Sequence, residues 1–245
     1  METKRIGVLG GMGPAATSEL YRRIINFTDV KTDQEHVNLV ILNNTNIPDR
    51  TNFILGNGKN PLPEMIKSIK ELNGMKVSAI AIPCMTAHTF INELQEQSSV
   101  SVINAIKLVD EKLKKEYSTV ENVALLATDG SIKSNVYQRF IDKNIIVPHN
   151  EKQREIMDVI YGKNGIKAGN NTIDLVERVN AVIEGMKNEG ANVVIAGCTE
   201  LGLILNDTNS VLPVIDPINL LANELIEIYQ KEMGGKSNAS IKFVQ

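Results

Sequence analysis

Hydrophobic and polar positions along the chain alternate between two patterns. Short continuous apolar runs predict buried strands, and longer stretches with apolar residues at helical spacing predict amphipathic helices. The expected strands cover residues 5–10, 37–42, 77–82, 100–103, 123–127, 145–147 and the run that ends at Cys198. The expected helices cover residues 15–30, 65–72, 86–95, 105–115, 153–161 and 173–187, with one more through Val136 and Phe140 and a last one that ends at Met233. Strands that alternate with helices predict an α/β protein with mostly parallel sheets.

The same order of elements occurs twice. Gly10, in the turn after the first strand, precedes Cys84 by nearly the same number of positions as Ala127 precedes Cys198. A repeat of this kind indicates an internal duplication. The sequence therefore predicts two pseudo-symmetric α/β domains, each a mostly parallel sheet flanked by helices, with an active-site cleft between them. The predicted first domain consists of residues 1–115 and 217–245, and the second of residues 116–216.

Two of the expected strands end in a cysteine, and the chain contains only these two cysteines, Cys84 and Cys198. A threonine follows closely in each case, Thr86 and Thr199. A thiol at a strand-to-helix junction lies beside unsatisfied helix N–H groups and the positive end of the helix dipole, which lower its pKa. One cysteine at a strand end is more often a packing residue. The duplicated setting nevertheless favours a pair of reactive thiols and a two-base active site.

Composition narrows the classes of partner. The chain has 245 residues, a formal net charge of -3 and a pI of about 5.7, so it shows no basic surface for nucleic acid or an anionic membrane. No signal segment precedes Arg5 and no apolar run is long enough to span a bilayer, so we expect a cytoplasmic protein with two free thiols. His36 and His149 lack partners at helical spacing, so no metal site is expected. The expected partner is a small-molecule substrate.

Three polar loops follow expected strands or helices and carry candidate binding groups. The turn Gly11–Gly13 can offer backbone N–H groups to a carboxylate. The long loop 43–61, of a length typical of functional segments, contains Arg50, and the Gly-rich loop 162–169 contains Lys167. Arginine offers a carboxylate a planar fork, and lysine a point charge. Ligands of open α/β sheets bind outside the carboxyl ends of the strands, so these loops are the expected binding region.

The motifs in these segments resemble those of the aspartate/glutamate racemase superfamily, most nearly its aspartate racemase branch. In chain order they are Gly-Gly-Met12-Gly13-Pro14, Ile-Pro-Asp-Arg50, Pro-Cys84-x-Thr86-Ala-His88, Ile-Lys167-Ala-Gly169 and Gly-Cys198-Thr199-Glu200. The resemblance implies a homodimeric enzyme that racemises an acidic amino acid without a cofactor, converting L-aspartate to D-aspartate, with glutamate or a broader range as further substrates. It also implies that one cysteine removes the Cα proton and the other protonates the opposite face.

The catalytic residues expected on this basis are Cys84 and Cys198. The expected substrate-binding residues are Met12, Gly13, Asn46, Arg50, Met85, Thr86, Thr128, Lys167, Thr199 and Glu200. Arg50 and Lys167 match the family's residues for the distal carboxylate. The family commonly has asparagine where this chain has Met85, and Asn44 and Asn46 can compensate for the missing amide. Glutamate racemases carry Asp-Ser where Gly10 and Gly11 stand, which favours aspartate or a broader range of substrates over glutamate alone.

Alternatives from other classes fit fewer residues. The segment from Gly11 to Ala16 formally satisfies the G-x-G-x-x-A pattern of dinucleotide-binding proteins, but Asn43 and Asn44 stand where that pattern needs an acidic residue. A non-catalytic amino-acid-binding protein would have two lobes but gives no reason for the paired cysteines. Within the superfamily, maleate isomerases, hydantoin racemases and decarboxylases reuse one or both cysteines and stay open as alternatives.

Overall fold

The computed structural model describes residues 4–234 and 240–241, and it divides into two compact units. The first unit comprises Met1–Pro48, Asn60–Asn104 and Ile218–Gln245, and the second comprises Asp49–Lys59 and Ala105–Pro217. The loop around Arg50 and the segment 105–115 group with the second unit, whereas the division drawn from the sequence put both in the first domain. Each unit is described by itself below.

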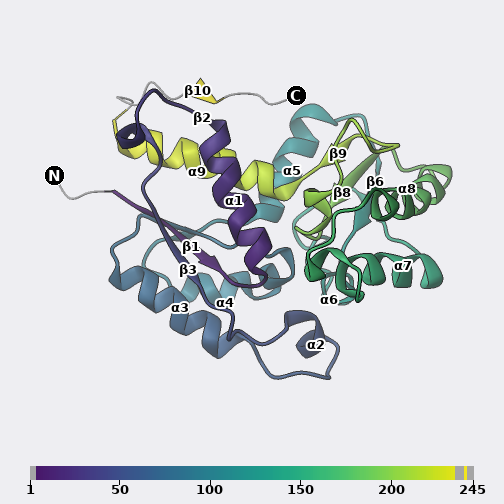
Figure 1. Ribbon diagram of the computed structural model, residues 1–245, viewed down its shortest axis with the longest axis horizontal. Coiled ribbons are helices and arrows are strands. Elements are labelled where there is room, and N and C mark those ends of the chain that lie inside the picture. The colour runs from purple at the N-terminus through teal and green to yellow at the C-terminus, as the bar shows by residue number, and fades with distance from the viewer. Residues whose placement is uncertain (1–3, 235–239, 242–245) are drawn as a thin grey trace. The chain divides into compact units, whose positions relative to one another are not determined.

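A four-stranded parallel sheet forms the centre of the first unit (Figure 1). Its strands, in the spatial order β3-β1-β4-β5, are β1 (Ile6–Gly10), β3 (Leu39–Asn43), β4 (Ala79–Ala81) and β5 (Ser101–Val102). The helices are α1 (Pro14–Phe27), α3 (Leu62–Gly74), α4 (Ile91–Glu96) and α9 (Pro217–Glu232), with the 3-10 helices η1 (Asp33–Glu35) and η2 (Met85–Phe90). A short antiparallel pair joins β2 (Thr28–Asp29) and β10 (Ser240–Ile241). All residues of β1 and β4 are buried, as expected for strands covered on both faces.

The second unit contains a four-stranded parallel sheet of the same design. Its strands, in the spatial order β7-β6-β8-β9, are β6 (Asn122–Leu126), β7 (Asn144–Ile146), β8 (Val193–Ala196) and β9 (Val214–Ile215). Its helices are α2 (Arg50–Ile54), α5 (Ala105–Glu116), α6 (Asp129–Lys133), α7 (Asn150–Tyr161) and α8 (Ile173–Asn188), with the 3-10 helices η3 (Ile166–Ala168) and η4 (Leu201–Leu203). The apolar faces of α7 and α8 pack on this sheet through residues such as Ile156, Val179 and Ile183, which have no exposed surface.

The strand order places a topological switch point in each unit. From β1 the chain first goes to β3 on one side and later to β4 on the other, and from β6 it goes first to β7 and later to β8. Open α/β sheets bind ligands at such points, outside the carboxyl ends of the strands. The matching orders give the predicted duplication a structural counterpart. The predicted α/β class, with a mostly parallel sheet flanked by helices in each half, is confirmed.

Several elements differ from the sequence prediction, among them a short helix, α2, inside the segment 43–61 that was predicted as a loop. The helix expected through Val136 and Phe140 is absent, because Asn135 adopts φ 52 and the chain continues in turns after α6. Helix α1 ends at Phe27 rather than at residue 30, where the Thr28 hydroxyl donates to the Ile24 carbonyl at 2.5 Å and the chain enters β2. The helix expected over 86–95 is divided into η2 and α4.

Close backbone packing joins α2 to α6 within the second unit. A Cβ added to Gly130 in α6 would lie 2.8 Å from the Cα of Thr51 in α2, so only glycine permits this approach. The contact fixes the start of α2, where Arg50 is the first residue. It explains why this loop belongs to the second unit, although it follows β3 in the chain.

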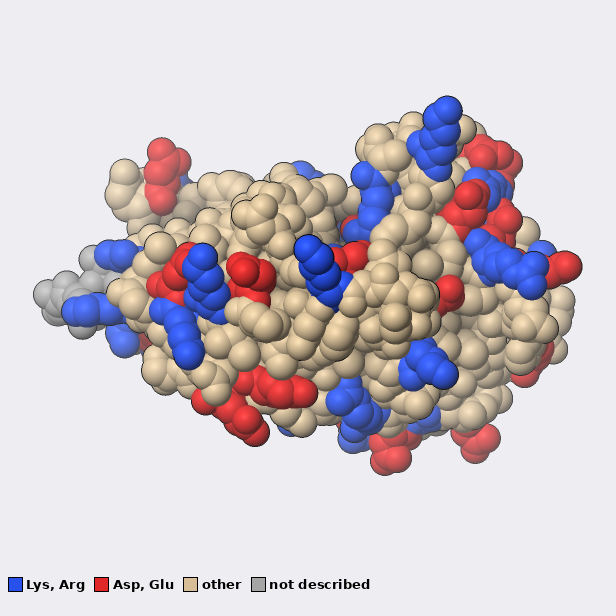
Figure 2. Space-filling view, turned by 90° about the horizontal axis from the view of Figure 1, so that it is seen from below, with Lys and Arg blue, Asp and Glu red and all other residues tan. Residues whose placement is uncertain are grey.

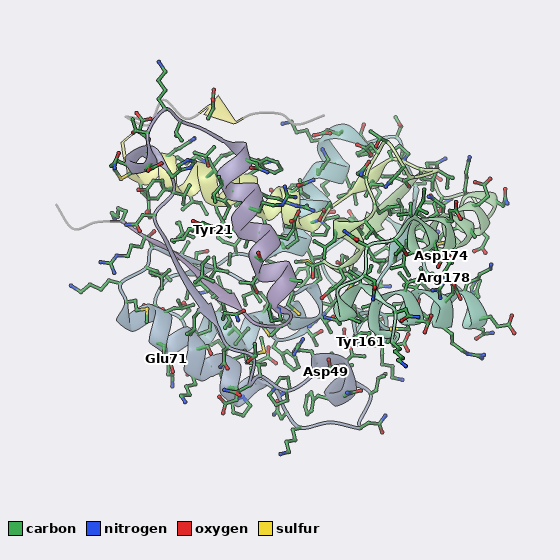
Figure 3. The ribbon with its side chains drawn as sticks, viewed as in Figure 1. Tyr21, Asp49, Glu71, Tyr161, Asp174 and Arg178 are labelled. Carbon is green, nitrogen blue, oxygen red and sulfur yellow. The ribbon has the colours of Figure 1, made fainter. Side chains whose placement is uncertain are left out.

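The helices on either side of the Lys167 loop are tied together by Arg178 of α8 (Figure 3). Its guanidinium contacts two carboxylates of α7, Glu155 at 2.5 Å and Asp158 at 2.6 Å. Exposed pairs of this kind stabilise a fold by about 1 kcal/mol or less. Their effect here is to fix the spacing of α7 and α8, and with it the two ends of the loop that carries Lys167.

One face of the molecule (Figure 2) shows no dominance of one charge. On the face drawn in Figure 2, Lys and Arg side chains are interspersed with Asp and Glu. This mixture agrees with the small formal net charge of -3. Among the helices that the structure describes, none has the length and apolar character needed to cross a membrane.

Candidate active site

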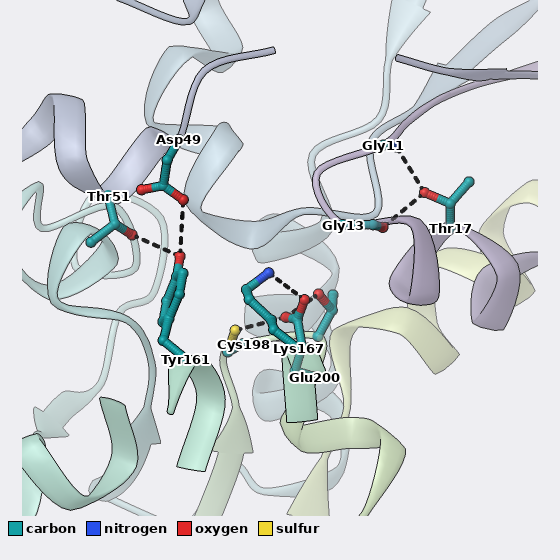
Figure 4. A network of polar contacts seen from close by, with 10 residues as sticks. Gly11, Gly13, Thr17, Asp49, Thr51, Tyr161, Lys167, Cys198 and Glu200 are labelled. Atoms are coloured by element: carbon teal, nitrogen blue, oxygen red, sulfur yellow. Dashed lines mark hydrogen bonds and ion pairs between the residues drawn. The ribbon is translucent and has the colours of Figure 1, made fainter. Parts of the chain in front are cut away.

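The Gly-rich turn after β1 is folded onto the start of α1 by one hydroxyl (Figure 4). Thr17 Oγ1 accepts a hydrogen bond from the Gly11 N–H at 3.0 Å and donates to the Gly13 carbonyl at 3.1 Å. Gly11 has φ 91, and a Cβ there would lie 2.4 Å from the backbone of Asn44, so glycine is required. The Gly11 N–H, expected to be a donor for a carboxylate, is therefore used within the turn.

Cys84 lies just beyond β4, on one side of the switch point of the first unit. Its carbonyl is held by two donors, the Ala87 N–H at 3.1 Å and the ring of His88, whose Nδ1 lies 3.0 Å away. A carbonyl only accepts, so Nδ1 carries the proton. The predicted binding residues Met85 and Thr86 follow directly in η2, and both are buried.

His88 is neutral and fixes the turn that carries Cys84. The ring has no exposed surface, and burial lowers its pKa to about 4 although hydrogen bonds to backbone groups of Cys84, Ile103 and Met85 favour the charged form. The neutral imidazole makes hydrogen bonds to backbone groups of this turn and of Ile103 after β5, and these bonds hold the turn in place. His88 is therefore a packing residue of this turn.

Cys198 lies just beyond β8, at the corresponding place in the second unit. Gly197, which precedes it, passes so close to β6 that a Cβ would lie 2.5 Å from Leu125 Cδ1 and 2.9 Å from the Leu126 carbonyl. The Tyr137 hydroxyl donates to the Gly197 carbonyl at 2.9 Å. These contacts fix the backbone on which the Cys198 thiol is mounted.

The side chains after Cys198 form a compact polar cluster with Lys167 (Figure 4). Lys167 Nζ lies 2.5 Å from Glu200 Oε1. The other oxygen, Oε2, accepts hydrogen bonds from the Cys198 thiol at 2.9 Å and from the Thr199 hydroxyl at 3.1 Å. The predicted residues Lys167, Cys198, Thr199 and Glu200 are thus brought together, all within the second unit.

The ionisation of this cluster differs from the sequence prediction. Burial raises the pKa of Cys198, and the Glu200 carboxylate adds to the increase. Burial alone would also raise the pKa of Glu200, but Lys167 and hydrogen bonds outweigh it and hold that pKa below its ordinary value. The expectation of a low thiol pKa is therefore wrong for Cys198, because the thiol is buried and a carboxylate lies against the sulfur.

Arg50 is buried at the start of α2, and its two neighbours in sequence contact Tyr161 of α7 (Figure 4). The Tyr161 hydroxyl lies 3.3 Å from Asp49 Oδ2 and 3.5 Å from Thr51 Oγ1, and Lys167 Nζ lies 5.2 Å from the centre of the Tyr161 ring. Tyr161 therefore contacts both predicted cationic loops. Sequence reasoning missed it, because no local pattern pairs the end of α7 with a loop so distant in the chain.

The remaining predicted binding residues differ in burial and in hydrogen bonding. Thr128, with 1% of its surface exposed, caps α6 by accepting from the Ser131 N–H at 3.2 Å. Asn46 is exposed, and its N–H donates to the side chain of Asn44 at 3.0 Å. Met12 is buried and Gly13 is partly exposed in the turn after β1. In the ranges that the structure describes, no group of three or more His, Cys, Asp or Glu side chains is placed to hold a metal ion.

The comparison with protein families shows to which family the chain belongs. The family description Asp/Glu/Hydantoin racemase matches residues 9–225. The chain belongs to this family. The resemblance inferred from the motifs is therefore confirmed, and this family member is an amino-acid racemase.

Individual relatives cover nearly the whole racemase chain. An aspartate racemase of Picrophilus torridus is 30% identical, with a TM-score of 0.80 over 98% of this chain and 96% of that one. The broad-specificity amino-acid racemase RacX of Bacillus subtilis is 26% identical over 91% of this chain and 97% of its own. An aspartate racemase homologue of Pyrococcus horikoshii, 23% identical with a TM-score of 0.73 over 93% and 100%, shares the fold.

Proposed function

We propose that this racemase interconverts the enantiomers of aspartate, or of a similar acidic amino acid, with Cys84 and Cys198 as its two acid–base groups. The observation that carries the proposal is the equivalent placement of the thiols. Each follows the strand next to β1 or β6, at the switch point where an α/β sheet binds its ligand. The aspartate racemase named above, 30% identical, supports the choice of substrate.

Inversion at Cα explains why two thiols are needed. The Cα–H of an amino acid is weakly acidic, so its removal needs a placed base and stabilisation of the charge that develops on the carboxylate. One thiolate removes the proton from one face, and the electron pair passes into the carboxylate. The other thiol then delivers a proton to the opposite face and becomes a thiolate. No redox change occurs, and the proton balance closes between the two thiols.

Cations for a second carboxylate support an acidic substrate. Arg50 is buried next to the Tyr161 contacts, and Lys167 lies over the Tyr161 ring. Burial lowers the pKa of Lys167, but Glu200 outweighs this effect and the pKa lies above its ordinary value, so Lys167 is charged at neutral pH. We assign Arg50 and Lys167 to the distal carboxylate. Met12, Gly13, Asn46, Met85, Thr86, Thr128 and Thr199 remain proposed substrate contacts, and a cytoplasmic homodimer remains a prediction.

A broader amino-acid range is a second candidate, and one contact favours it. The Lys167 charge is already balanced by Glu200 at 2.5 Å, which weakens its preference for a carboxylate over a neutral side chain. The relative RacX, 26% identical, is a broad-specificity enzyme. The ratio of kcat/KM for aspartate to kcat/KM for alanine separates the two candidates.

The experiment that tests the proposal uses purified protein without added cofactor in deuterated water. L-Aspartate and D-aspartate are incubated separately, and loss of the Cα–H signal by NMR is compared with formation of the other enantiomer by chiral chromatography. We expect that each enantiomer loses its Cα–H signal and also gives rise to the other enantiomer. Activity that appears only on addition of pyridoxal phosphate, or that survives replacement of both cysteines, contradicts the proposal. Parallel incubations with maleate and with a hydantoin test the related activities.

A further inference from the structure

Three hydrogen-bond donors surround the buried carboxylate of Glu200, which lies beside the Cys198 thiol. Only 2% of its surface is exposed. Oε1 lies 2.5 Å from Lys167 Nζ, and Oε2 accepts from the Cys198 thiol at 2.9 Å and from the Thr199 hydroxyl at 3.1 Å. All four residues belong to the second unit. Both oxygens of the carboxylate are thus engaged by groups of the protein itself.

This geometry requires a proton on the Cys198 sulfur. An ionised carboxylate can only accept, so a contact of 2.9 Å is favourable for S–H and repulsive for a thiolate. Lys167 keeps the Glu200 carboxylate charged, so the proton stays on sulfur. The other titratable group whose charge reaches the sulfur is Tyr161, which is neutral because burial raises its pKa.

The duplicated cysteine has different surroundings. In the described part of the first unit, no carboxylate hydrogen-bonds the Cys84 sulfur, and the residue two positions after it is Thr86, where the second unit has Glu200. The contacts around Cys84 hold its carbonyl, through Ala87 and His88, and not its thiol. The two thiols are therefore equivalent in the fold but not in their electrostatic surroundings.

We propose that Glu200 is a catalytic residue that holds Cys198 as the proton donor of the resting enzyme. The inference rests on the proposed two-cysteine function and assigns the roles within it. In the direction of reaction that starts from this form, Cys84 is the base that takes the Cα proton. Cys198 gives its proton to the opposite face and becomes a thiolate beside Glu200. The opposite enantiomer reacts with the form in which the proton lies on Cys84, and the same steps run backwards.

The first test measures the thiol directly. In a Cys84→Ser variant, Cys198 is the chain's only cysteine, so ultraviolet thiolate absorbance reports its titration alone. Adding Glu200→Gln should move the midpoint to lower pH by more than about one unit, because the repelling carboxylate is gone while Lys167 remains. Glu200→Asp, which withdraws the charge from the sulfur but keeps it for Lys167, should give a smaller shift. The matched control is Glu155→Gln, which removes a carboxylate of α7 paired with Arg178 and should leave the midpoint unchanged.

The second test measures the pH dependence of racemisation with both cysteines present. The thiol that donates its proton sets the alkaline limb of the kcat/KM profile. Glu200→Gln should shift that limb to lower pH by the amount seen in the thiol titration, equally for both enantiomers because the equilibrium constant is one. A merely structural role for Glu200 lowers kcat/KM at every pH without moving the limb. If neither Glu200→Gln nor Glu200→Asp moves the titration midpoint of Cys198, the inference is wrong. The proposed function still stands in that case if Cys198→Ser abolishes racemisation. Racemisation by Cys198→Ser contradicts the proposed function itself.

Discussion

At the scale of single residues, the decisive difference lies between two cysteines with similar sequence contexts. A short apolar run and a threonine mark both, but the Cys198 thiol donates to Glu200 whereas Cys84 is held through its carbonyl. The sequence placed both thiols at strand ends, and the fold confirms those places. The ionisation of Cys198 could not be predicted, because it depends on which oxygen of Glu200 turns toward the sulfur and which toward Lys167.

The first prediction concerns the two thiols. Cys84→Ser and Cys198→Ser should each abolish racemisation, because a serine hydroxyl is too weakly acidic to replace a thiolate. At least one variant should still exchange the Cα proton of a single enantiomer with solvent, since exchange needs only one base. NMR of L- and D-aspartate in deuterated water measures this. Interconversion near the parent rate in either variant rules out the two-base mechanism.

The second prediction concerns the cations. Arg50→Ala and Lys167→Ala should reduce kcat/KM for aspartate more than for alanine, because each removes a charge assigned to the distal carboxylate. Loss of a buried charge partner typically costs about 2 to 5 kcal/mol. Lys167→Arg is the matched control for the Glu200 ion pair, since it keeps the charge. Equal losses for aspartate and alanine would assign both residues to structure.

At the scale of elements, the turns that end β1, β4, β6 and β8 fix the candidate site. Apolar runs predicted these strands well, because a fully buried strand needs apolar residues at every position. The region after α6 was predicted poorly: Val136, Tyr137 and Ile141 are buried at helical spacing, yet Asn135 at φ 52 turns the chain. Apolar spacing reports burial, and a chain in successive turns can bury the same residues as a helix.

The third prediction concerns the Gly-rich turn. Thr17→Val keeps the shape of the side chain but leaves the Gly11 N–H without its acceptor, so it should lower the free energy of unfolding by about 1 to 3 kcal/mol. Thr17→Ser retains the hydroxyl and should lose less. Urea denaturation followed by circular dichroism measures both. A Val variant as stable as the Ser variant would show that the hydroxyl does not stabilise the turn.

At the scale of the whole molecule, a buried neutral histidine links stability to pH. The folded-state pKa of His88 is about 4, below the ordinary value of 6.5, so the unfolded chain binds a proton first as the pH falls. The contribution of neutral His88 to the free energy of unfolding is complete above pH 6.5. It declines between that value and about pH 4 and is absent at lower pH. Over the full window the shift corresponds to about 3 kcal/mol.

The fourth prediction follows from this link. Thermal unfolding of the parent protein should move to lower temperature between about pH 7.5 and about pH 5, where most carboxylates are still ionised. His88→Asn should be less stable at neutral pH but should lose less on acidification. His149→Asn, whose side chain is 77% exposed, serves as the control and should follow the parent. A His88 variant with the parent's pH dependence would contradict the assignment.

Each of the two units is made of segments that are not continuous in the chain, and this has a consequence for folding during synthesis on the ribosome. The first unit needs residues from Ile218 onward, whereas the second needs none beyond Pro217. The N-terminal unit is therefore the later of the two to have all its residues emerged with the nascent chain. The early segment Asp49–Lys59 also has to find its partners in residues made much later. A fragment that begins at Ala105 lacks this segment and with it Arg50, so neither unit can be obtained by one cut of the chain.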